Sequence, residues 1–244
     1  MNEWQPKTCV VVGATGGIGR AFVGHLAERE GIETIVCLSR SGEVPVQSSR
    51  VEAGQLDYTD TGTIETAVEQ AKQNGPFDLV IVATGLLHSG DFGPEKSLRD
   101  LDADRLMRVL HVNTIGPALV AKHFLPPMRK NGKSVFAALS ARVGSISDNH
   151  IGGWYGYRSA KAALNQMLRT AAVEHARRWK EGVVIGLHPG TVDTELSAPF
   201  QGNVAEDKLF SSEYATGEML KVIDNVAAAD TGRVFAYDGS EVPA

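Results

Sequence analysis

Short apolar runs alternate along the chain with longer stretches in which apolar residues recur every three or four positions. A continuous apolar run that ends in glycine or another turn residue is typical of a strand buried on both faces. This pattern predicts strands at residues 8–12, 34–38, 51–56, 77–83, 133–139, 183–187 and 234–237. The helical spacing predicts helices at about 18–26, 63–74, 100–124, 157–179 and 212–227. The alternation favours one α/β domain over residues 1–244, with a doubly wound, mostly parallel sheet and helices on both faces.

Composition narrows the class of protein. The 244 residues are 43% hydrophobic and carry a formal net charge of −5, with no basic run, so neither nucleic acid nor an anionic membrane is an expected partner. No signal-peptide pattern opens the chain, and no stretch approaches 18 apolar residues. Cys9 and Cys37 lie inside apolar runs, which predicts buried free thiols and a cytoplasmic protein. No Cys/His cluster has metal-ligand spacing, so no metal is expected.

A glycine-rich segment, Gly13-Ala-Thr-Gly-Gly-Ile-Gly19, separates the first predicted strand from the first helix. Strand, glycine turn and helix in this order form a phosphate cradle, because glycines allow close backbone approach and the helix N-terminus attracts the anion. We therefore predict dinucleotide binding here. The predicted contacts are Gly13, Thr15, Gly17, Ile18 and Gly19.

The end of the second predicted strand indicates which dinucleotide is bound. An NAD-preferring site carries an acidic residue there for the ribose 2′-hydroxyl, but this chain has Ser39 and Arg40, and its nearest acid is Glu43. An arginine would pair with a 2′-phosphate, which a carboxylate would repel. NADP(H) is therefore predicted in preference to NAD(H).

Two further strand ends add candidate cofactor contacts. Asp57 follows the third predicted strand, where it would accept a hydrogen bond from the adenine amino group or, equally well, cap a loop. Ala83, Thr84 and Gly85 end the next strand. Ligands of parallel α/β sheets lie outside the carboxyl ends of the strands, so these residues should border the cofactor.

Tyr157 and Lys161 are four residues apart and share one face of the predicted helix. An ammonium beside a phenol favours the phenolate, so this pair predicts a tyrosine acid/base whose pKa a lysine tunes. Alone, the spacing is more often that of an ordinary helix surface. Asn113 lies among apolar residues of the long helical pattern, where its amide would satisfy local backbone or hold a water near the active centre.

Together these motifs resemble the short-chain dehydrogenase/reductase superfamily over nearly the whole chain. The resemblance implies a seven-stranded Rossmann sheet and oxidoreduction between NAD(P)(H) and an alcohol or carbonyl compound. It makes Tyr157 the acid/base, Lys161 the lysine that binds the nicotinamide ribose, and Asn113 the family's helix asparagine. It also assigns the nicotinamide side of the cofactor to Pro189, Gly190, Val192 and Thr194. A homodimer or homotetramer is implied as well.

More narrowly, four segments look like C-factor-like and sniffer-like carbonyl reductases: Leu86-Leu-His88, Arg142-Val-Gly-Ser-Ile146, Gly152-Gly-Trp-Tyr155 and Ala236-Tyr-Asp-Gly239. Three positions depart from the family pattern, the first being Val12, where many members have threonine. Val82-Ala-Thr-Gly85 replaces Asn-Asn-Ala-Gly, so the asparagine that steadies the sheet is missing. Ala141 stands where relatives carry the serine that orients the carbonyl. Ser140 is the predicted substitute; Ser145, or Tyr157 alone, are the other possibilities.

The predicted function is therefore NADP(H)-dependent reduction of an aldehyde or ketone, with residues 195–211 as a substrate lid. The alternative is a cofactor-binding regulatory or signalling protein with weak or no turnover, which Ala141 and the missing asparagine favour. A sugar-nucleotide epimerase also uses Tyr-x-x-x-Lys but usually needs a larger C-terminal domain than follows Thr194.

Overall fold

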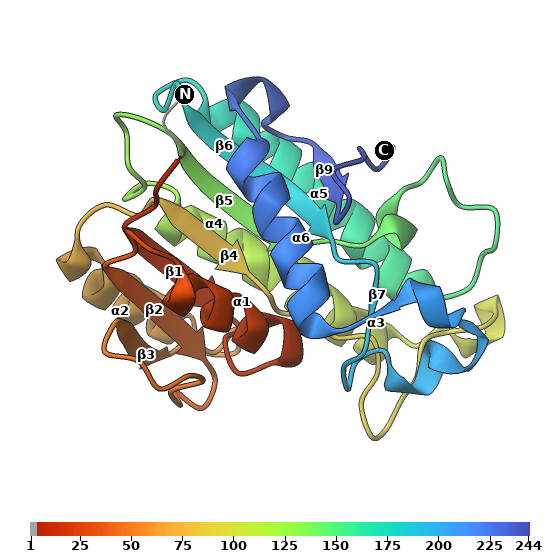
Figure 1. The fold of residues 1–244 in the computed structure, drawn as a ribbon. Coiled ribbons are helices and arrows are strands. Elements are labelled where there is room, and N and C mark those ends of the chain that lie inside the picture. The colour runs from red at the N-terminus through yellow and green to blue at the C-terminus, as the bar shows by residue number, and fades with distance from the viewer. Residues whose placement is uncertain (1–3) are drawn as a thin grey trace.

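Seven strands form the central sheet in the order β3-β2-β1-β4-β5-β6-β9, and all of their pairings are parallel (Figure 1). The computed structural model describes residues 4–244. The strands are β1 (Thr8–Val12), β2 (Thr34–Ser39), β3 (Val51–Gln55), β4 (Leu79–Val82), β5 (Ser134–Leu139), β6 (Gly182–His188) and β9 (Val234–Ala236). Each predicted strand is therefore confirmed, with ends that differ by at most two residues.

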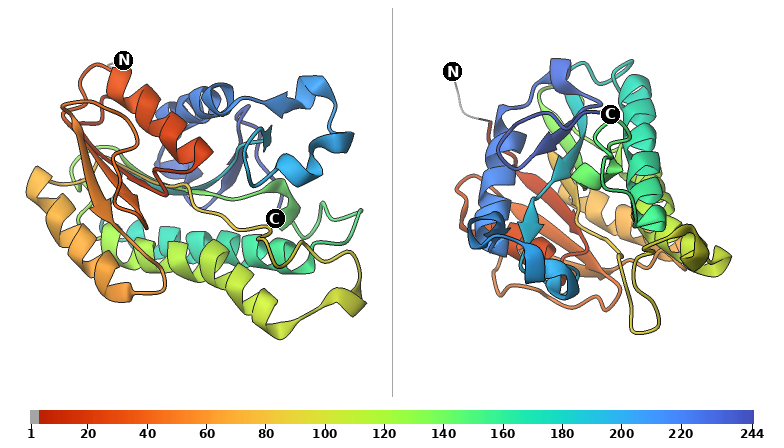
Figure 2. Two further views of the ribbon diagram at one scale, coloured as in Figure 1. Left: turned by 90° about the horizontal axis from the view of Figure 1, so that it is seen from below. Right: turned by 90° about the vertical axis from the view of Figure 1, so that its right-hand side faces the viewer.

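Helices cover both faces of this sheet, as Figure 2 shows in its left view. One face carries α1 (Gly17–Glu28) and α6 (Ser212–Asn225). The other carries α2 (Thr61–Ala71), α4 (Gly116–Phe124) and α5 (Tyr155–His175), with α3 (Ala103–Leu110) leading into α4. Alternate residues of each strand enter different cores: Cys9 and Val11 pack on the side of α1 and α6, whereas Val10 and Val12 pack on the opposite side. The doubly wound architecture is confirmed.

The helix predicted over residues 100–124 is interrupted. A π-helical turn, His111–Ile115, separates α3 from α4 and places Asn113 in the break. The apolar spacing carries through such a turn, so the pattern did not reveal it. Short 3-10 turns occur at Lys72–Asn74, Leu98–Asp100, Arg142–Gly144, Ala198–Asn203, Glu206–Lys208 and Ala228–Asp230. A small parallel pair, β7 (Thr191–Val192) and β8 (Leu209–Phe210), was too short to predict.

The strand order reverses between β1 and β4, because the chain builds β1, β2 and β3 outward in one direction before it returns to place β4 on the other side of β1. Ligands of open α/β sheets bind at the carboxyl ends of strands at such a reversal. Cys9 and Cys37 are buried free thiols, as predicted. Among residues 4–244, none of the helices combines the length and apolar character that a membrane span needs.

Candidate active site

The turn between β1 and α1 can receive a phosphate. Gly13 has a φ of +83°, which L side chains rarely adopt. A Cβ atom on Gly19 would lie 2.1 Å from the Gly13 carbonyl oxygen, so only glycine fits there. Helix α1 has no acidic residue in its first turn, and no side chain caps its N-terminus. The positive end of the helix dipole is therefore uncompensated, as a dinucleotide-phosphate cradle requires.

The segment after β6 lies against this cradle. A Cβ atom on Gly17 would be 3.0 Å from Thr194 Cγ2, so the glycine turn and the segment after Pro189 border one space. Gly190 has a φ of +78° and passes so close to Phe210 that a Cβ atom would meet its ring at 2.7 Å. Val192 lies in β7 and is buried. The two predicted cofactor segments are thus adjacent, although they are far apart in the sequence.

Ser39, Arg40 and Asp57 lie together at the carboxyl ends of β2 and β3. Ser39 is buried, and its hydroxyl accepts a hydrogen bond from the Gly42 N–H at 3.1 Å. Arg40 is exposed, and its charge helps to hold the pKa of Asp57 below its usual value, after the two hydrogen bonds from Thr59. Both Thr59 bonds end on Oδ1 of Asp57. Asp57 therefore closes a local turn, which is one of its two predicted roles.

The main chain after β4 is hydrogen-bonded to Asn113, which lies in the π-helical turn between α3 and α4. The side-chain oxygen of Asn113 accepts the Leu86 N–H at 3.1 Å, and its amide donates to the carbonyls of Leu86 and Val109 at 2.7 and 2.9 Å. Asn113 is fully buried, so these bonds offset the cost of burying its amide. Of the two predicted roles, satisfying local backbone is the one the structure shows. Ala83, Thr84 and Gly85 lie between this clamp and the glycine turn, with Thr84 Cγ2 2.9 Å from a Cβ built on Gly13.

Tyr157 and Lys161 lie on one face of α5, with the Lys161 ammonium 5.6 Å from the centre of the Tyr157 ring. Lys161 is only 2% exposed, and its Nζ donates to the Leu139 carbonyl at 2.8 Å. Burial lowers the pKa of Lys161 to about 7. Burial also raises the pKa of the Tyr157 phenol above its ordinary value. In the protein alone, burial thus outweighs the lysine that was expected to lower the tyrosine pKa, and the Lys161 ammonium bonds a main-chain carbonyl.

Ser140 and Ser145, the two candidate substitutes for the missing serine, both have hydroxyls that are hydrogen-bonded within the protein. The Ser140 hydroxyl donates to Asn165 Oδ1 on α5 at 2.6 Å and is 3% exposed. The Ser145 hydroxyl accepts the Asp148 N–H at 3.2 Å and lies near the Ala244 carbonyl. Ala141 is itself buried at the end of β5. This geometry argues against Ser140 as the group that orients a carbonyl, because its one hydrogen is already donated.

An aromatic cluster that the sequence did not predict lies beside Tyr157. The Trp154 ring meets Tyr157 edge-on, with centroids 6.4 Å apart, and meets Phe200 at 5.2 Å. His88 completes the row, 5.6 Å from Phe200, and its Nε2 lies 3.2 Å from the Glu195 carbonyl oxygen. Three loops therefore meet over Tyr157. Trp154 was discernible from its place just before the helix, whereas no local signal pairs it with Phe200.

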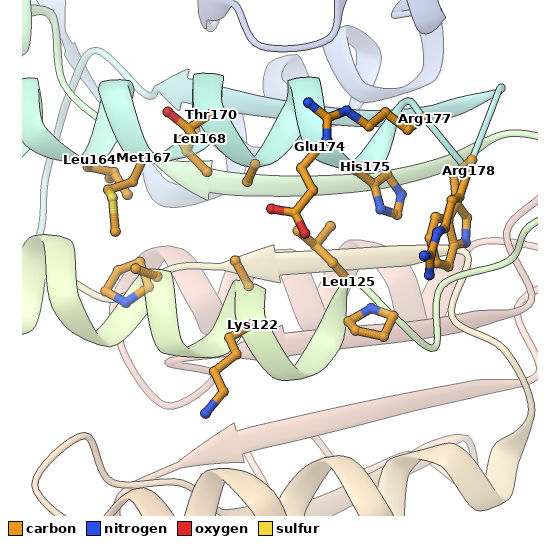
Figure 3. Close-up of a pocket in the computed structure, with 16 residues that line it drawn as sticks. Lys122, Leu125, Leu164, Met167, Leu168, Thr170, Glu174, His175, Arg177 and Arg178 are labelled. Atoms are coloured by element: carbon orange, nitrogen blue, oxygen red, sulfur yellow. The ribbon is translucent and has the colours of Figure 1, made fainter.

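A cavity of about 610 Å³ lies elsewhere, between α4 and α5 (Figure 3). Its wall combines apolar residues with Lys122, Glu174 and Arg178, and none of the predicted site residues lines it. The cavity is therefore separate from the candidate active site.

Known proteins resemble this chain in sequence and in fold. The sequence matches the family described as short chain dehydrogenase over residues 7–204. The chain belongs to that family. A 1-hydroxy-2-glutathionyl-2-methyl-3-butene dehydrogenase of Rhodococcus is 31% identical over 236 residues, covering 96% of this chain and 98% of the relative. The C-signal protein of Myxococcus xanthus is 33% identical over 169 residues, covering 69% of this chain and 93% of the relative.

Among solved structures, the NADPH-bound carbonyl reductase from chicken fatty liver superposes with a TM-score of 0.85 at 22% identity, covering 99% of this chain and all of that one. At this identity the likeness establishes the fold, a seven-stranded Rossmann sheet of the short-chain dehydrogenase type. Family membership makes the protein an oxidoreductase.

Proposed function

We propose that this short-chain dehydrogenase reduces the carbonyl group of an aldehyde or ketone with NADP(H), and that Tyr157 is the proton donor. The observation that carries the proposal is that Tyr157 lies beside a buried Lys161, whose ammonium bonds the last residue of β5. Strand β5 is next to β4, and β4 is next to β1, which leads into the glycine cradle. A lysine on an ordinary helix surface would keep its ammonium in solvent, so this pair is not such a surface.

The glycine turn fits the phosphates of a nicotinamide dinucleotide, because its glycines pack tightly against the neighbouring main chain and the N-terminus of α1 carries neither an acidic residue nor a side-chain cap. When bound, the cofactor supplies the hydride that reduces the carbonyl carbon. The residues proposed to hold it are Gly13, Thr15, Gly17, Ile18, Gly19, Ser39, Arg40, Asp57, Ala83, Thr84, Gly85, Tyr157, Lys161, Pro189, Gly190, Val192 and Thr194. Arg40 is the reason to prefer NADP(H), since its exposed guanidinium would meet a 2′-phosphate.

Tyr157 gives its proton to the carbonyl oxygen as the alcohol forms. Its raised pKa keeps the phenol protonated at neutral pH, which suits a proton donor in the reduction direction. After transfer, the phenolate lies beside Lys161, whose lowered pKa of about 7 lets it hold or pass a proton near neutrality. The lysine therefore stabilises the phenolate and helps to restore its proton.

Asn113 serves the proposed proton path through the π-helical turn in which it lies. Both hydrogens of its amide are donated to main-chain carbonyls, so the water that leads to Lys161 would bond a main-chain carbonyl of this turn and not the amide. With Ser140 turned toward Asn165, we propose that Tyr157 polarises the substrate carbonyl without a serine. Ser140 would join it only if its hydroxyl left Asn165.

The test is NADPH oxidation with a panel of aldehydes and ketones, comparing wild type with Tyr157→Phe. Because general acid catalysis contributes about 10²–10⁴ in rate, the variant should lose at least a hundredfold in kcat while NADPH still binds. Tyr155→Phe, two residues earlier on the same helix, is the matched control and should keep its activity. Full activity in Tyr157→Phe would show that Tyr157 is not the proton donor.

The second candidate function is that of a cofactor-binding regulatory protein with little turnover. The Ser140 and Ser145 hydroxyls, both engaged away from Ala141, favour it. The similarity to the C-signal protein is compatible with this alternative. Tight NADPH binding with no turnover of any carbonyl compound would support the second candidate over the first.

The remaining proposals concern the surroundings of the site. Residues 195–211 serve as the substrate lid, since they carry Phe200 toward Trp154.

We also propose that the protein forms a homodimer or homotetramer, in which a second copy covers the half-exposed Met167 and Val173 of α5. Light scattering of wild type and Met167→Glu tests this: the variant should shift toward a smaller species. A cytoplasmic location and a single domain over residues 1–244 complete the proposal.

A further inference from the structure

Glu95 is a buried carboxylate that bonds the start of the helix carrying Tyr157. It lies in the loop before Leu98 and is 7% exposed, and among the described residues no Lys, Arg or His forms an ion pair with it. Its Oε2 accepts the Gly156 N–H at 3.0 Å. A buried carboxylate needs such donors, and the positive end of a helix favours it.

The bond replaces a cap that α5 lacks. Trp154, the residue before the helix, provides no side-chain cap. The first N–H groups of a helix have no partner within it and are usually satisfied by a side chain at that position. Here the partner comes from a distant loop, so the first turn of α5 is attached to the loop that follows β4.

A second bond from the same residue holds Trp154. The main-chain oxygen of Glu95 accepts the Trp154 N–H at 2.5 Å. Trp154 has a φ of +52°, and it is the one non-glycine residue in 4–244 with a positive φ. A bulky residue does not keep a left-handed conformation unless its surroundings hold it there. The main-chain bond from Glu95 thus supports the backbone of Trp154, whose indole lies edge-on to Tyr157.

Gly156 allows this approach. A Cβ atom at position 156 would lie 2.9 Å from Glu95 Oε1 and 3.0 Å from Leu106 Cδ2. Any side chain there would push the carboxylate away. The residue directly before Tyr157 is therefore a contact point for Glu95.

The two ends of the Tyr157–Lys161 turn are anchored differently. Lys161 is bonded to β5 through Leu139, and a Cβ atom on Gly144 would be 2.8 Å from Lys161 Cβ, so the lysine end is packed against the β5 side. The Tyr157 end is attached through Glu95. We propose that Glu95 is a positioning residue, which sets where the Tyr157 hydroxyl stands relative to the substrate carbonyl. This inference rests on the proposed function.

The test compares Glu95→Ala, Glu95→Gln and wild type in NADPH-dependent carbonyl reduction. Small misplacements of a reacting group cost up to about a hundredfold in rate. Glu95→Ala should therefore lower kcat roughly ten- to a hundredfold, with the Kd for NADPH unchanged within about twofold. Glu95→Gln keeps an oxygen that can accept the Gly156 N–H and should stay within about threefold of wild type. Gly156→Ala, whose Cβ atom would displace the carboxylate, should lower kcat as well.

Asp100→Ala is the matched control. Asp100 is an exposed carboxylate nearby that accepts the Lys96 and Ser97 N–H groups at 3.0 and 2.8 Å, and within residues 4–244 it forms no hydrogen bond or ion pair with α5. It should leave kcat unchanged. If Glu95→Ala and Asp100→Ala behave alike, or if Glu95→Ala keeps wild-type kcat, the positioning role is overturned.

Amide hydrogen exchange keeps the inference separate from the proposed function. Exchange in a peptide spanning residues 154–160 should be at least tenfold faster in Glu95→Ala and unchanged in Asp100→Ala. An inactive wild type would defeat the proposed function, and the exchange data would still decide whether Glu95 holds the start of α5. Unchanged exchange in Glu95→Ala would refute the inference whatever the turnover.

Discussion

The Ser140 hydroxyl donates a hydrogen bond of 2.6 Å to Asn165 Oδ1, across the interface between β5 and α5. This bond turns the only serine at the end of β5 into a packing residue, next to the alanine that stands where relatives carry a serine. We therefore expect substitutions at the two positions to have different effects. Ser140 should contribute to stability, whereas the residue at position 141 should decide whether a hydroxyl besides that of Tyr157 can donate to the substrate carbonyl.

Ser140→Ala should lower the free energy of unfolding by about 1 kcal/mol, because a neutral buried hydrogen bond is lost. Its kcat for carbonyl reduction should stay within about threefold of wild type. Ala141→Ser should instead raise kcat at least threefold, since a single oxyanion donor contributes about 10²–10³ where it is well placed. Steady-state kinetics and denaturant titrations measure both. A hundredfold loss in Ser140→Ala would show that its hydroxyl reaches the substrate after all.

Lys161 should make the stability of the protein depend on pH in an unusual direction. Its pKa is about 7 in the folded protein and near 10.5 when unfolded, so between these values the unfolded state binds more protons and stability rises with pH. Integration over pH 7 to 8.5 gives a gain of about 1.5 kcal/mol from this group alone. Lys161→Met should lack that gain. The measurement is the difference in unfolding free energy between the two proteins at each pH, and an equal slope in both would contradict the buried-lysine assignment.

Gly19→Ala should fail to form the glycine cradle. The new Cβ atom would lie 2.1 Å from the Gly13 carbonyl oxygen, which is main chain and cannot move aside cheaply. We expect loss of NADPH binding and a large fall in Tm. Gly24→Ala on the same helix is the control, because nothing lies within 4 Å of its Cβ, and it should gain up to about 1 kcal/mol from helix propensity. Cofactor fluorescence titration and thermal melts distinguish the two.

Arg40→Gln should weaken NADPH binding and leave NADH binding unchanged. A hydrogen bond to a charged group contributes about 1.5–3 kcal/mol, which corresponds to roughly 10–100-fold in Kd. Arg50→Gln serves as the control, since Arg50 precedes β3 at the opposite end of the sheet and donates to the Arg29 carbonyl. Equal affinities of the wild type for NADPH and NADH would refute the contact between Arg40 and the 2′-phosphate.

The sequence by itself determined the strands, the main helices and the glycine turn between β1 and α1. Buried parallel strands are continuous apolar runs, as in Thr8–Val12, and a glycine cradle is a local feature that its own residues specify. The spacing of Tyr157 and Lys161 likewise depends only on their sharing one helix. These properties depend on residues that are close together in the chain, so the sequence alone predicts them.

Tertiary structure alone decided how distant segments serve Tyr157. The capping of α5 by Glu95 joins residues 61 positions apart, and the contact of Trp154 with Phe200 depends on where two loops fold over the sheet edge. The direction of the Ser140 hydroxyl and the depressed pKa of Lys161 also depend on burial between β5 and α5. Hydrogen-bond partners and desolvation are set by packing in three dimensions, so the same residue types in the same order left them open.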